Sequence, residues 1–424
     1  MMFWRKAEKR QPTHAQRLFH GLVREWLWIG LLLLPITAYL SLSPGLALNN
    51  PLYDSLRRLT PLPVDPRILL VTIDDASLKK LGQWPWPRSL HADLIDRLSA
   101  AQPAGILFDV IFSEPGNAAN DKRLAEAVCN AGNVLLPLVR EGTASYSEPG
   151  EQMLPLLKCA KGVGHINVEA DSDGVVRSLY MREGPPAATA AQLAWLAYQL
   201  SGEAQAMPGE PQDSSAQTWH REHAIRIPFI APHTHFPSVS YVSVLHGEVP
   251  SELLRNRLIL VGATASGMGD RFVTPLSSTV GTTAGVEIQA NVLNGLLQGR
   301  SIVDLPGWLA ATMATFLVAL LLGLLLYRPR YALWMTLGCM AVALLGSWAL
   351  LRLGHWWSPA ACLIGLLLSY LIWNWRRLSV ILAYFGWELA RLDNEPKVLP
   401  ERRRAPASKR SEEHTSELQS LRHL

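Results

Sequence analysis

Three long apolar runs in the last third of the chain constrain the fold more than any other feature. They occupy residues 307–327, 331–351 and 356–375, and none contains an Asp, Glu, Lys or Arg. A helix needs about 20 apolar residues to cross the roughly 30 Å hydrocarbon core of a bilayer, and each run meets that length. The connections, RPR at 328–330 and RLGH at 352–355, are short enough to force successive helices to be antiparallel. The sequence therefore predicts a tight bundle of three helices that spans a lipid bilayer.

A fourth uncharged run lies near the N-terminus, at residues 26–48. It exceeds the roughly 7 to 15 apolar residues of a cleaved signal peptide, which is the alternative interpretation. We therefore predict an uncleaved first span.

The positive-inside rule sets the expected topology, because basic residues are enriched in short cytoplasmic segments. Six basic residues lie within residues 1–25, the RPR connection follows the second predicted span, and an Arg pair follows the fourth. With these segments in the cytoplasm, residues 49–305 lie outside it, as does the loop with the single Arg352. Both chain termini are then cytoplasmic.

The charge distribution supports this division. Residues 44–304 hold 20 Lys plus Arg and 26 Asp plus Glu, a net charge of −6, whereas the rest holds 19 against 9, a net charge of +10, which together give +4. The basic excess belongs to the membrane flanks, so we expect no nucleic-acid partner.

The outer segment shows an alternation of strand and helix patterns. Apolar, β-rich runs at 67–75 and 104–112 flank a helical pattern at 91–102, and a hairpin pattern spans 164–181. These patterns predict a layered α/β sandwich, mostly parallel with an antiparallel excursion, plus four transmembrane helices. Residues 203–220 are polar and contain Pro, so we expect a surface insertion there.

Polar and aromatic residues gather where two of the predicted strands end. Asp74 and Asp75 follow the first strand, and Asp109 ends the next strand. Trp84, Trp86 and Arg88 lie between them on a Pro-containing loop. Ligands of open α/β sheets bind at the carboxyl ends of the strands, so these six residues are candidates for a pocket. The alternative is structural: the tryptophans cover the core and Arg88 pairs with an Asp.

Other sequence patterns give weaker evidence for a functional site. Cys129 and Cys159 form a disulfide if their domain is outside the cytoplasm and their separation allows it. The His pairs in HREH and HTH, at 220–223 and 233–235, lack an acidic partner, and the glycine loop at 261–270 lacks the Lys of a phosphate loop. We expect neither a metal nor another cofactor.

Five motifs, in order, resemble the class-2 CHASE domain, an extracytoplasmic sensor domain of bacterial receptors. They are VTIDDASLKKLGQWPWPRSLHADLI, ILFDVIFSEP, INVEADSDGVVR, LVGATASGMGDRFVTPL and GVEIQANVLNGLL, and three predicted spans follow them. The resemblance covers about residues 50–377. It implies a multi-pass protein of the bacterial plasma membrane, a homodimer, an undefined extracytoplasmic ligand and no catalytic residue in the sensor. The positions that match the motifs are candidate ligand residues: Asp74, Asp75, Trp86, Arg88, Asp109, Asp270, Arg271 and Glu287.

Receptors of this family carry an output domain after the last span: a histidine kinase, a nucleotide or diguanylate cyclase, or a Ser/Thr kinase. Residues 376–409 are expected to form a cytoplasmic linker, and 382–403 resemble the linker of histidine-kinase members. Residues 410–420, RSEEHTSELQS, match the translation of a sequencing adapter, so we expect 410–424 to be an assembly artefact that replaces the output domain; the alternative is a native disordered tail.

Three functions follow as hypotheses. The first is the input half of a membrane receptor, without a catalytic domain of its own. The second is a membrane-anchored extracytoplasmic hydrolase that uses Asp74, Asp75 and Asp109 with a metal ion. The third is a structural or adaptor protein.

Overall fold

The computed structural model describes most of the chain. The described residues are 14–43, 45–112, 116–138, 140–141, 145–146, 158–185, 189–203, 206–208, 219–268, 271–277 and 281–394. The chain divides into two compact units, residues 1–370 and 371–424, which are described separately. In the second unit the described residues all belong to α14 (Ala360–Asn394), which begins in the first unit. The predicted insertion at 203–220 lies largely outside the described residues, and the predicted tail does so entirely.

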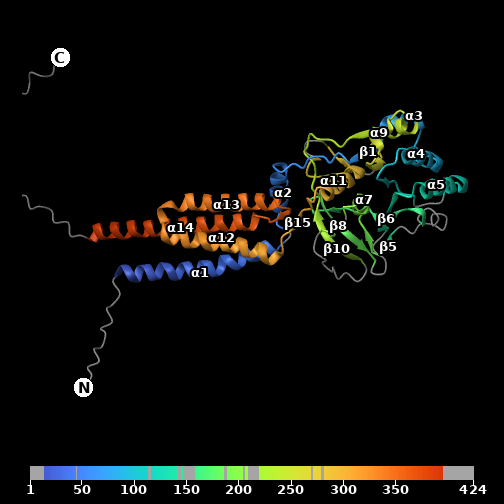
Figure 1. The fold of residues 1–424 in the computed structure, drawn as a ribbon. Helices are drawn as coiled ribbons and strands as arrows, with labels where there is room; N and C mark the ends of the chain where they lie inside the picture. Colours follow the sequence, from blue (N-terminus) through green and yellow to red (C-terminus); the bar gives the residue numbers. More distant parts are fainter. Residues whose placement is uncertain are drawn as a thin grey trace, which may run out of the picture. The chain divides into compact units, whose positions relative to one another are not determined.

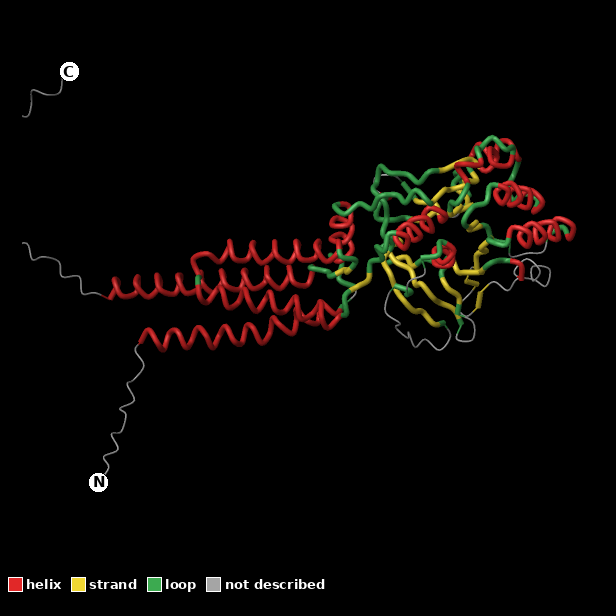
Figure 2. The backbone as a smooth tube through the Cα atoms, viewed as in Figure 1, coloured by secondary structure: helices red, strands yellow, loops and turns green. Residues whose placement is uncertain are grey.

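A parallel sheet of six strands forms the centre of the outer domain (Figure 2). Its strands, in spatial order, are β11 (Ser238–Ser240), β1 (Ile68–Ile73), β12 (Leu258–Ala263), β2 (Gly105–Asp109), β3 (Val134–Leu138) and β6 (Gly162–His165). Every neighbouring pair is parallel. The predicted α/β class with a parallel sheet is therefore confirmed.

Alternate side chains of the sheet enter two separate cores, as the two-residue period of a strand requires. In β1, Ile68 and Leu70 belong to one core, whereas Leu69, Val71 and Ile73 belong to the other. Because both faces are buried, the strands are continuously apolar instead of alternating.

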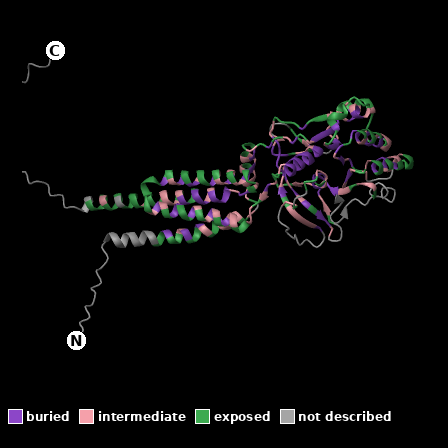
Figure 3. Cartoon of the chain, in the orientation of Figure 1, coloured by how far each residue is buried: buried purple, intermediate pink, exposed green. Residues whose placement is uncertain are grey.

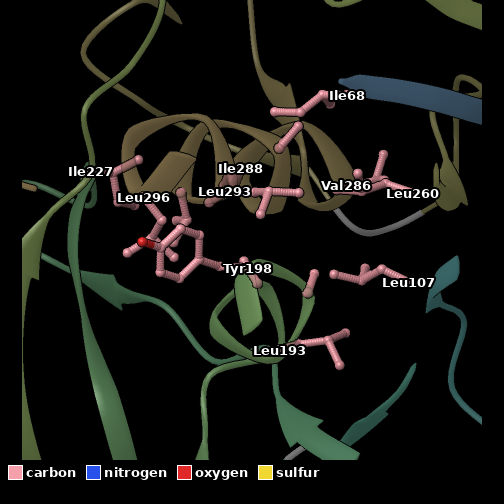
Figure 4. Close-up of a cluster of buried hydrophobic side chains, with 14 of the residues drawn as sticks. Ile68, Leu107, Leu193, Tyr198, Ile227, Leu260, Val286, Ile288, Leu293 and Leu296 are labelled. Atoms are coloured by element: carbon pink, nitrogen blue, oxygen red, sulfur yellow. The ribbon is translucent and has the colours of Figure 1, made fainter. Parts of the chain in front are cut away.

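Helices cover both faces of this sheet. The second core contains residues of α4 (Arg88–Ala100), α5 (Ala118–Ala131), α8 (Tyr241–Leu245) and α9 (Ser251–Leu254), and residues of α3 (Asp75–Leu81) pack against it. The first core contains residues of α7 (Leu193–Leu200) and α11 (Gly285–Leu297). Figure 4 shows Tyr198 of α7 beside Leu296 of α11, with Leu193 of α7 in the same cluster. Nearly every residue of α11 is buried, which makes it the most enclosed helix of the domain in Figure 3.

An antiparallel sheet forms the predicted excursion. It consists of β10 (His220–Arg226), β8 (Val176–Gly184), β7 (Glu169–Ala170) and β9 (Ala190–Ala191), with β8 pairing to the other three. Leu179 and Met181 of β8 and Ile225 of β10 join the first core. Three two-stranded pairs complete the strands: β4 (Arg140–Glu141) with β5 (Ser145–Tyr146), β13 (Arg271–Phe272) with β14 (Thr283–Ala284), and β15 (Val303–Asp304) with β16 (His355–Trp356).

Three helices of the first unit are long and apolar enough to cross a membrane. Their candidate spans are Arg24–Leu42 in α1 (His14–Leu42), Gly307–Tyr327, which is all of α12, and Pro329–Arg352, which contains η2 (Pro329–Tyr331) and α13 (Ala332–Arg352). α12 packs along α1 and along α13 (Figure 1). Large apolar side chains on these helices are exposed, for example Trp28 at 67%, Phe316 at 65% and Trp334 at 72%. A lipid environment gives such surfaces the apolar contacts that water does not.

Two details of the predicted spans differ from the structure. The predicted first span ends at residue 48, whereas α1 ends at Leu42 and α2 (Asn49–Arg58) begins after a turn, because Ser43, Pro44 and Gly45 do not favour continued helix. The predicted fourth span, 356–375, falls mainly on α14, which is not among the three candidate spans in the described part. Its uncharged helical part runs only from Ala360 to Trp375 before two arginines, so the count of four spans stays a prediction.

Candidate ligand cavity

A cavity of about 1030 Å³ lies at the carboxyl ends of the three central strands of the parallel sheet. Ile73, Asp109 and Ala263, each the last residue of its strand, line it. Open parallel sheets bind ligands at this edge, and the volume suits a small organic molecule. The fold thus places a hollow where the sequence predicts a pocket.

The rest of the cavity lining comes largely from elements distant in sequence. Residues that follow β6, the end of β8 and the start of α11 contribute Ile166, Asn167, Val168, Glu169, Glu183, Gly285, Ile288 and Gln289. α11 approaches this closely because β12 has a glycine there: a Cβ on Gly262 would lie 2.5 Å from the Cβ of Val286. The lining combines aliphatic side chains with a few carboxylates and amides, as small-molecule sites commonly do.

The charged side chains that line the cavity, among the described residues, are acidic: Asp109, Glu169 and Glu183. Arg221 pairs with Glu169 at 2.8 Å and lies 3.7 Å from the Glu183 carboxylate. Glu183 is only 2% exposed and accepts a hydrogen bond from the Asn167 amide. Burial raises the pKa of the Glu183 carboxyl above its ordinary value.

His165 lies behind Glu183, with Nδ1 3.9 Å from Oε1, and its side chain is fully buried. Neither ring nitrogen has a hydrogen-bond partner in the described part of the chain. Burial lowers the pKa of His165 to about 3, so the ring is neutral at pH 7 and does not compensate the charge of Glu183.

Comparison with protein families identifies the outer domain. The family model of the CHASE2 domain matches residues 27–327, which run from α1 through the sensor to the end of α12. The chain belongs to the CHASE2 family. CHASE2 is an extracytoplasmic sensor domain of bacterial receptors, as the resemblance of the motifs implies. No curated protein and no solved structure matched the chain.

Of the predicted CHASE2 ligand residues, Asp109 is the one that lines the large cavity in the described residues, and Asp270 lies outside those residues. Asp74 caps α3, accepting hydrogen bonds from the backbone N–H and hydroxyl of Ser77 and from the hydroxyl of Ser240. Burial alone would raise the pKa of Asp74, but these hydrogen bonds outweigh it and lower the pKa. Asp75 accepts a hydrogen bond of 3.2 Å from the N–H of Ser266, and so supports the cavity rim.

Trp86 and Arg88 take the structural positions that the sequence offers as the alternative. Trp86 is 4% exposed and donates its indole N–H to the carbonyl of Gly82 at 2.9 Å. Arg88 pairs with Asp121 at 2.6 Å, in a largely buried contact, and lies over the Phe112 ring. Their neighbour Trp84, which the sequence also offers as a pocket residue, lines the cavity.

Arg271 and Glu287 hold the β13–β14 region together. Arg271 donates to the hydroxyl and the carbonyl of Thr282, and Glu287 accepts the N–H of Ala284 at 3.1 Å. Both line a separate, small hollow of about 150 Å³. The predicted CHASE2 residues therefore divide between the cavity, its supports and other parts of the fold.

Sequence reasoning missed Glu183, although a signal for it existed. In β8 the two-residue period puts Leu179, Met181 and Glu183 on one face, and the first two are fully buried. An acid on a buried strand face is rare unless it is paired or functional. Glu169 was within a quoted motif, but only the packing of β7 on β8 brings it to Glu183 and Arg221.

The described residues of the CHASE2 domain offer no group of three or more His, Cys, Asp or Glu side chains that is arranged to hold a metal ion. Asp74 and Asp75 support α3 and the loop at Ser266, and they do not line the cavity with Asp109. Cys129 of α5 and Cys159 are bonded, with their Cα atoms 4.7 Å apart.

Proposed function

We propose that this chain is the input and transmembrane signalling portion of a bacterial receptor: its outer domain binds a stimulus in the large cavity and controls a cytoplasmic output domain. One structural observation carries the proposal. Strand β8 has the cavity-lining Glu183 near one end and Arg177, which pairs with Asp54 of α2, near the other. The neighbouring strand β10 has Arg221, which pairs with the cavity-lining Glu169, near one end, and Arg226, which pairs with Asp304, at the other.

Strand β8 connects the cavity to the segment that follows α1. Glu183, near its end, lines the cavity, and Arg177, near its start, donates two hydrogen bonds of 2.8 Å to Asp54 of α2. Arg177 also binds Asp171 and Asp173 and is 2% exposed. Burial opposes its charge, but the hydrogen bonds to these carboxylates raise the pKa of Arg177. A buried charge held this way fixes the position of α2 against the strand.

Strand β10 connects the cavity to the other membrane-flanking elements. Arg221 at its start pairs with Glu169, and Arg226 at its end pairs with Asp304 at 2.5 Å, three residues before α12 begins at Gly307. The Arg226 guanidinium also lies over the ring of Tyr53 in α2, at 4.8 Å from the centroid, and near Trp356 in β16, at 5.8 Å. One side chain thus contacts elements adjoining α1, α12 and the α13–α14 connection.

These contacts support a simple means of signalling. A ligand that binds better to one arrangement of β8 and β10 shifts the population toward it. Because Arg177 and Arg226 tie these strands to the helix ends, the shift biases the helices and, through them, the output domain.

The membrane topology and the output domain are inferred from the sequence. We place both termini in the cytoplasm and residues 49–305 outside, from the distribution of basic residues. The output domain is a histidine kinase of a two-component system, by the resemblance of 382–403, with a nucleotide cyclase, diguanylate cyclase or Ser/Thr kinase as the alternative. The receptor is a homodimer, and the chain itself has no catalytic role.

A chimera tests the function. Residues 1–403 are fused to a reporter histidine kinase in cells, and basal output is compared for Arg226→Met and for the matched control Arg123→Met, whose side chain pairs on the surface with Asp93 and Asp96. We expect the first change to shift basal output several-fold and the second to leave it unchanged. Output that ignores both Arg226→Met and deletion of the outer domain would contradict the proposal.

A further inference from the structure

The chemistry of the large cavity narrows the class of ligand. Its three acidic residues come from two sheets: Asp109 from the end of β2 in the parallel sheet, and Glu169 and Glu183 from the antiparallel sheet. No Lys, Arg or His among the described residues lines the cavity. A ligand in this space meets carboxylates from both sheets.

Among the described ion pairs, one basic side chain contacts the carboxylates of the cavity. Glu169 and Glu183 both lie near one guanidinium, that of Arg221, at 2.8 and 3.7 Å. His165, whose Nδ1 lies 3.9 Å from Glu183 Oε1, is fully buried and neutral at pH 7. Carboxylates in a confined, partly apolar space favour an additional cation, because charge is poorly screened there.

The remaining lining determines what kind of cation fits. Aliphatic and aromatic side chains make up much of the wall, among them Leu78, Trp84, Ile111, Met268 and Phe272. A bare metal ion would gain nothing from these surfaces, and the described residues offer no group of three metal-binding side chains. An organic cation gains from both, since its ammonium groups meet the carboxylates and its hydrocarbon part displaces water from the apolar wall.

We propose that the cavity binds an organic amine: one or two protonated amino groups on an apolar body, paired with Asp109 of the parallel sheet and with Glu169 and Glu183 of the antiparallel sheet. This assignment rests on the proposed sensory function and names the chemical class of its stimulus. The lining also includes the amide side chains of Asn167 and Gln289, whose carbonyl oxygens are of a type that accepts N–H bonds.

Three probes of equal length and different charge test the ligand class. The full chain in nanodiscs of zwitterionic phosphatidylcholine is titrated by calorimetry with 1,6-diaminohexane, 1,6-hexanediol or adipate, with empty nanodiscs as the blank. We expect saturable binding of the diamine, no binding of adipate, and binding of the diol at least tenfold weaker than that of the diamine. Failure of the diamine to bind, or equal or tighter binding of the diol or adipate, would overturn the proposal.

Variants locate the binding. Asp109→Asn and Glu183→Gln keep the size of each side chain and remove its charge, and each should weaken diamine binding at least tenfold. Glu252→Gln, which removes an exposed acid in α9, should leave it unchanged. Since Glu183 is buried and its variant risks misfolding, the partly exposed Asp109 provides the second measurement. Diamine binding that neither variant weakens would place the amine elsewhere and refute the assignment.

The chimera separates this inference from the proposed function. If diamine does not bind but Arg226→Met still shifts the output, the ligand class is wrong and the signalling role stands. If diamine binds as expected but output ignores the outer domain, the site is an amine site that does not signal.

Discussion

Arg177 and Asp54 join the antiparallel sheet of the sensor to the helix that follows the first span, through two parallel hydrogen bonds of 2.8 Å. Their positions are separated by 123 residues in the sequence. A fork of two hydrogen bonds between a guanidinium and a carboxylate fixes both distance and orientation. The contact therefore holds β8 and α2 at a more defined distance and orientation than a single flexible ion pair would.

Replacing Arg177 with Met should lower the stability of the outer domain by about 1.5 to 3 kcal/mol, because the buried guanidinium makes charge-assisted hydrogen bonds to the partly exposed carboxylates of Asp54, Asp171 and Asp173. Thermal unfolding of the full chain in detergent, followed by tryptophan fluorescence, measures the loss. Arg182→Met, an exposed change on the same strand, is the control and should have little effect. An unfolding midpoint that is the same for Arg177→Met as for the parent would show that the ion pairs of Arg177 do not stabilise the domain.

The ion pair between Arg88 and Asp121 should contribute to stability but not to ligand binding. Asp121 also accepts the N–H of Gly116 at 3.0 Å, so the carboxylate organises the loop before α5. Arg88→Met should destabilise the domain by about 3 kcal/mol, since it leaves the largely buried carboxylate of Asp121 without its guanidinium partner. It should leave diamine affinity within about twofold, because Arg88 does not line the cavity. Calorimetry at a temperature where the variant is folded checks this, and a tenfold loss of affinity would instead make Arg88 a ligand residue.

Local patterns in the sequence predicted the elements well. The uncharged run at 307–327 has the same bounds as α12, and the apolar runs around residues 70 and 106 became β1 and β2. Both kinds of element depend on side chains close in sequence, namely on the length of an apolar run and on its period. Nothing distant is needed to recognise them.

Local sequence patterns could not predict the order of the strands in the sheet or the full set of residues that line the cavity. β12 lies between β1 and β2 although it follows them by well over a hundred residues, and this insertion determines which strand ends meet at the cavity. Glu183 and Arg221 meet because β8 and β10 pair across an insertion. Such contacts depend on chain topology, so Asp109 was predicted from its strand end while Glu183 was not.

The bond between Cys129 and Cys159 closes a loop with a sequence separation of 30. Chain-entropy arguments assign about 3.6 kcal/mol to a loop of this length. The double variant Cys129→Ser, Cys159→Ser should therefore lower the free energy of unfolding of the outer domain by roughly that amount. Thiol alkylation and mass spectrometry of the unreduced full chain, with Cys339 and Cys362 as internal free thiols, should leave the first pair unmodified. Alkylation of Cys129 without a reductant would contradict the bond.

Acid should destabilise the outer domain, in part through His165. Burial holds its pKa at about 3, against an ordinary value of 6.5, so between these pH values the unfolded chain binds a proton that the folded chain does not. Stability then falls on acidification by about 1.4 kcal/mol per pH unit in that window. The variant His165→Leu removes this titrating group without breaking a side-chain hydrogen bond in the described part. Its unfolding midpoint should therefore fall less than that of the parent when the pH is lowered from 6.5 to 4.5. The exposed His246→Gln is the control and should keep the parental slope. Equal slopes for His165→Leu and the parent would show that His165 is not buried as a neutral ring.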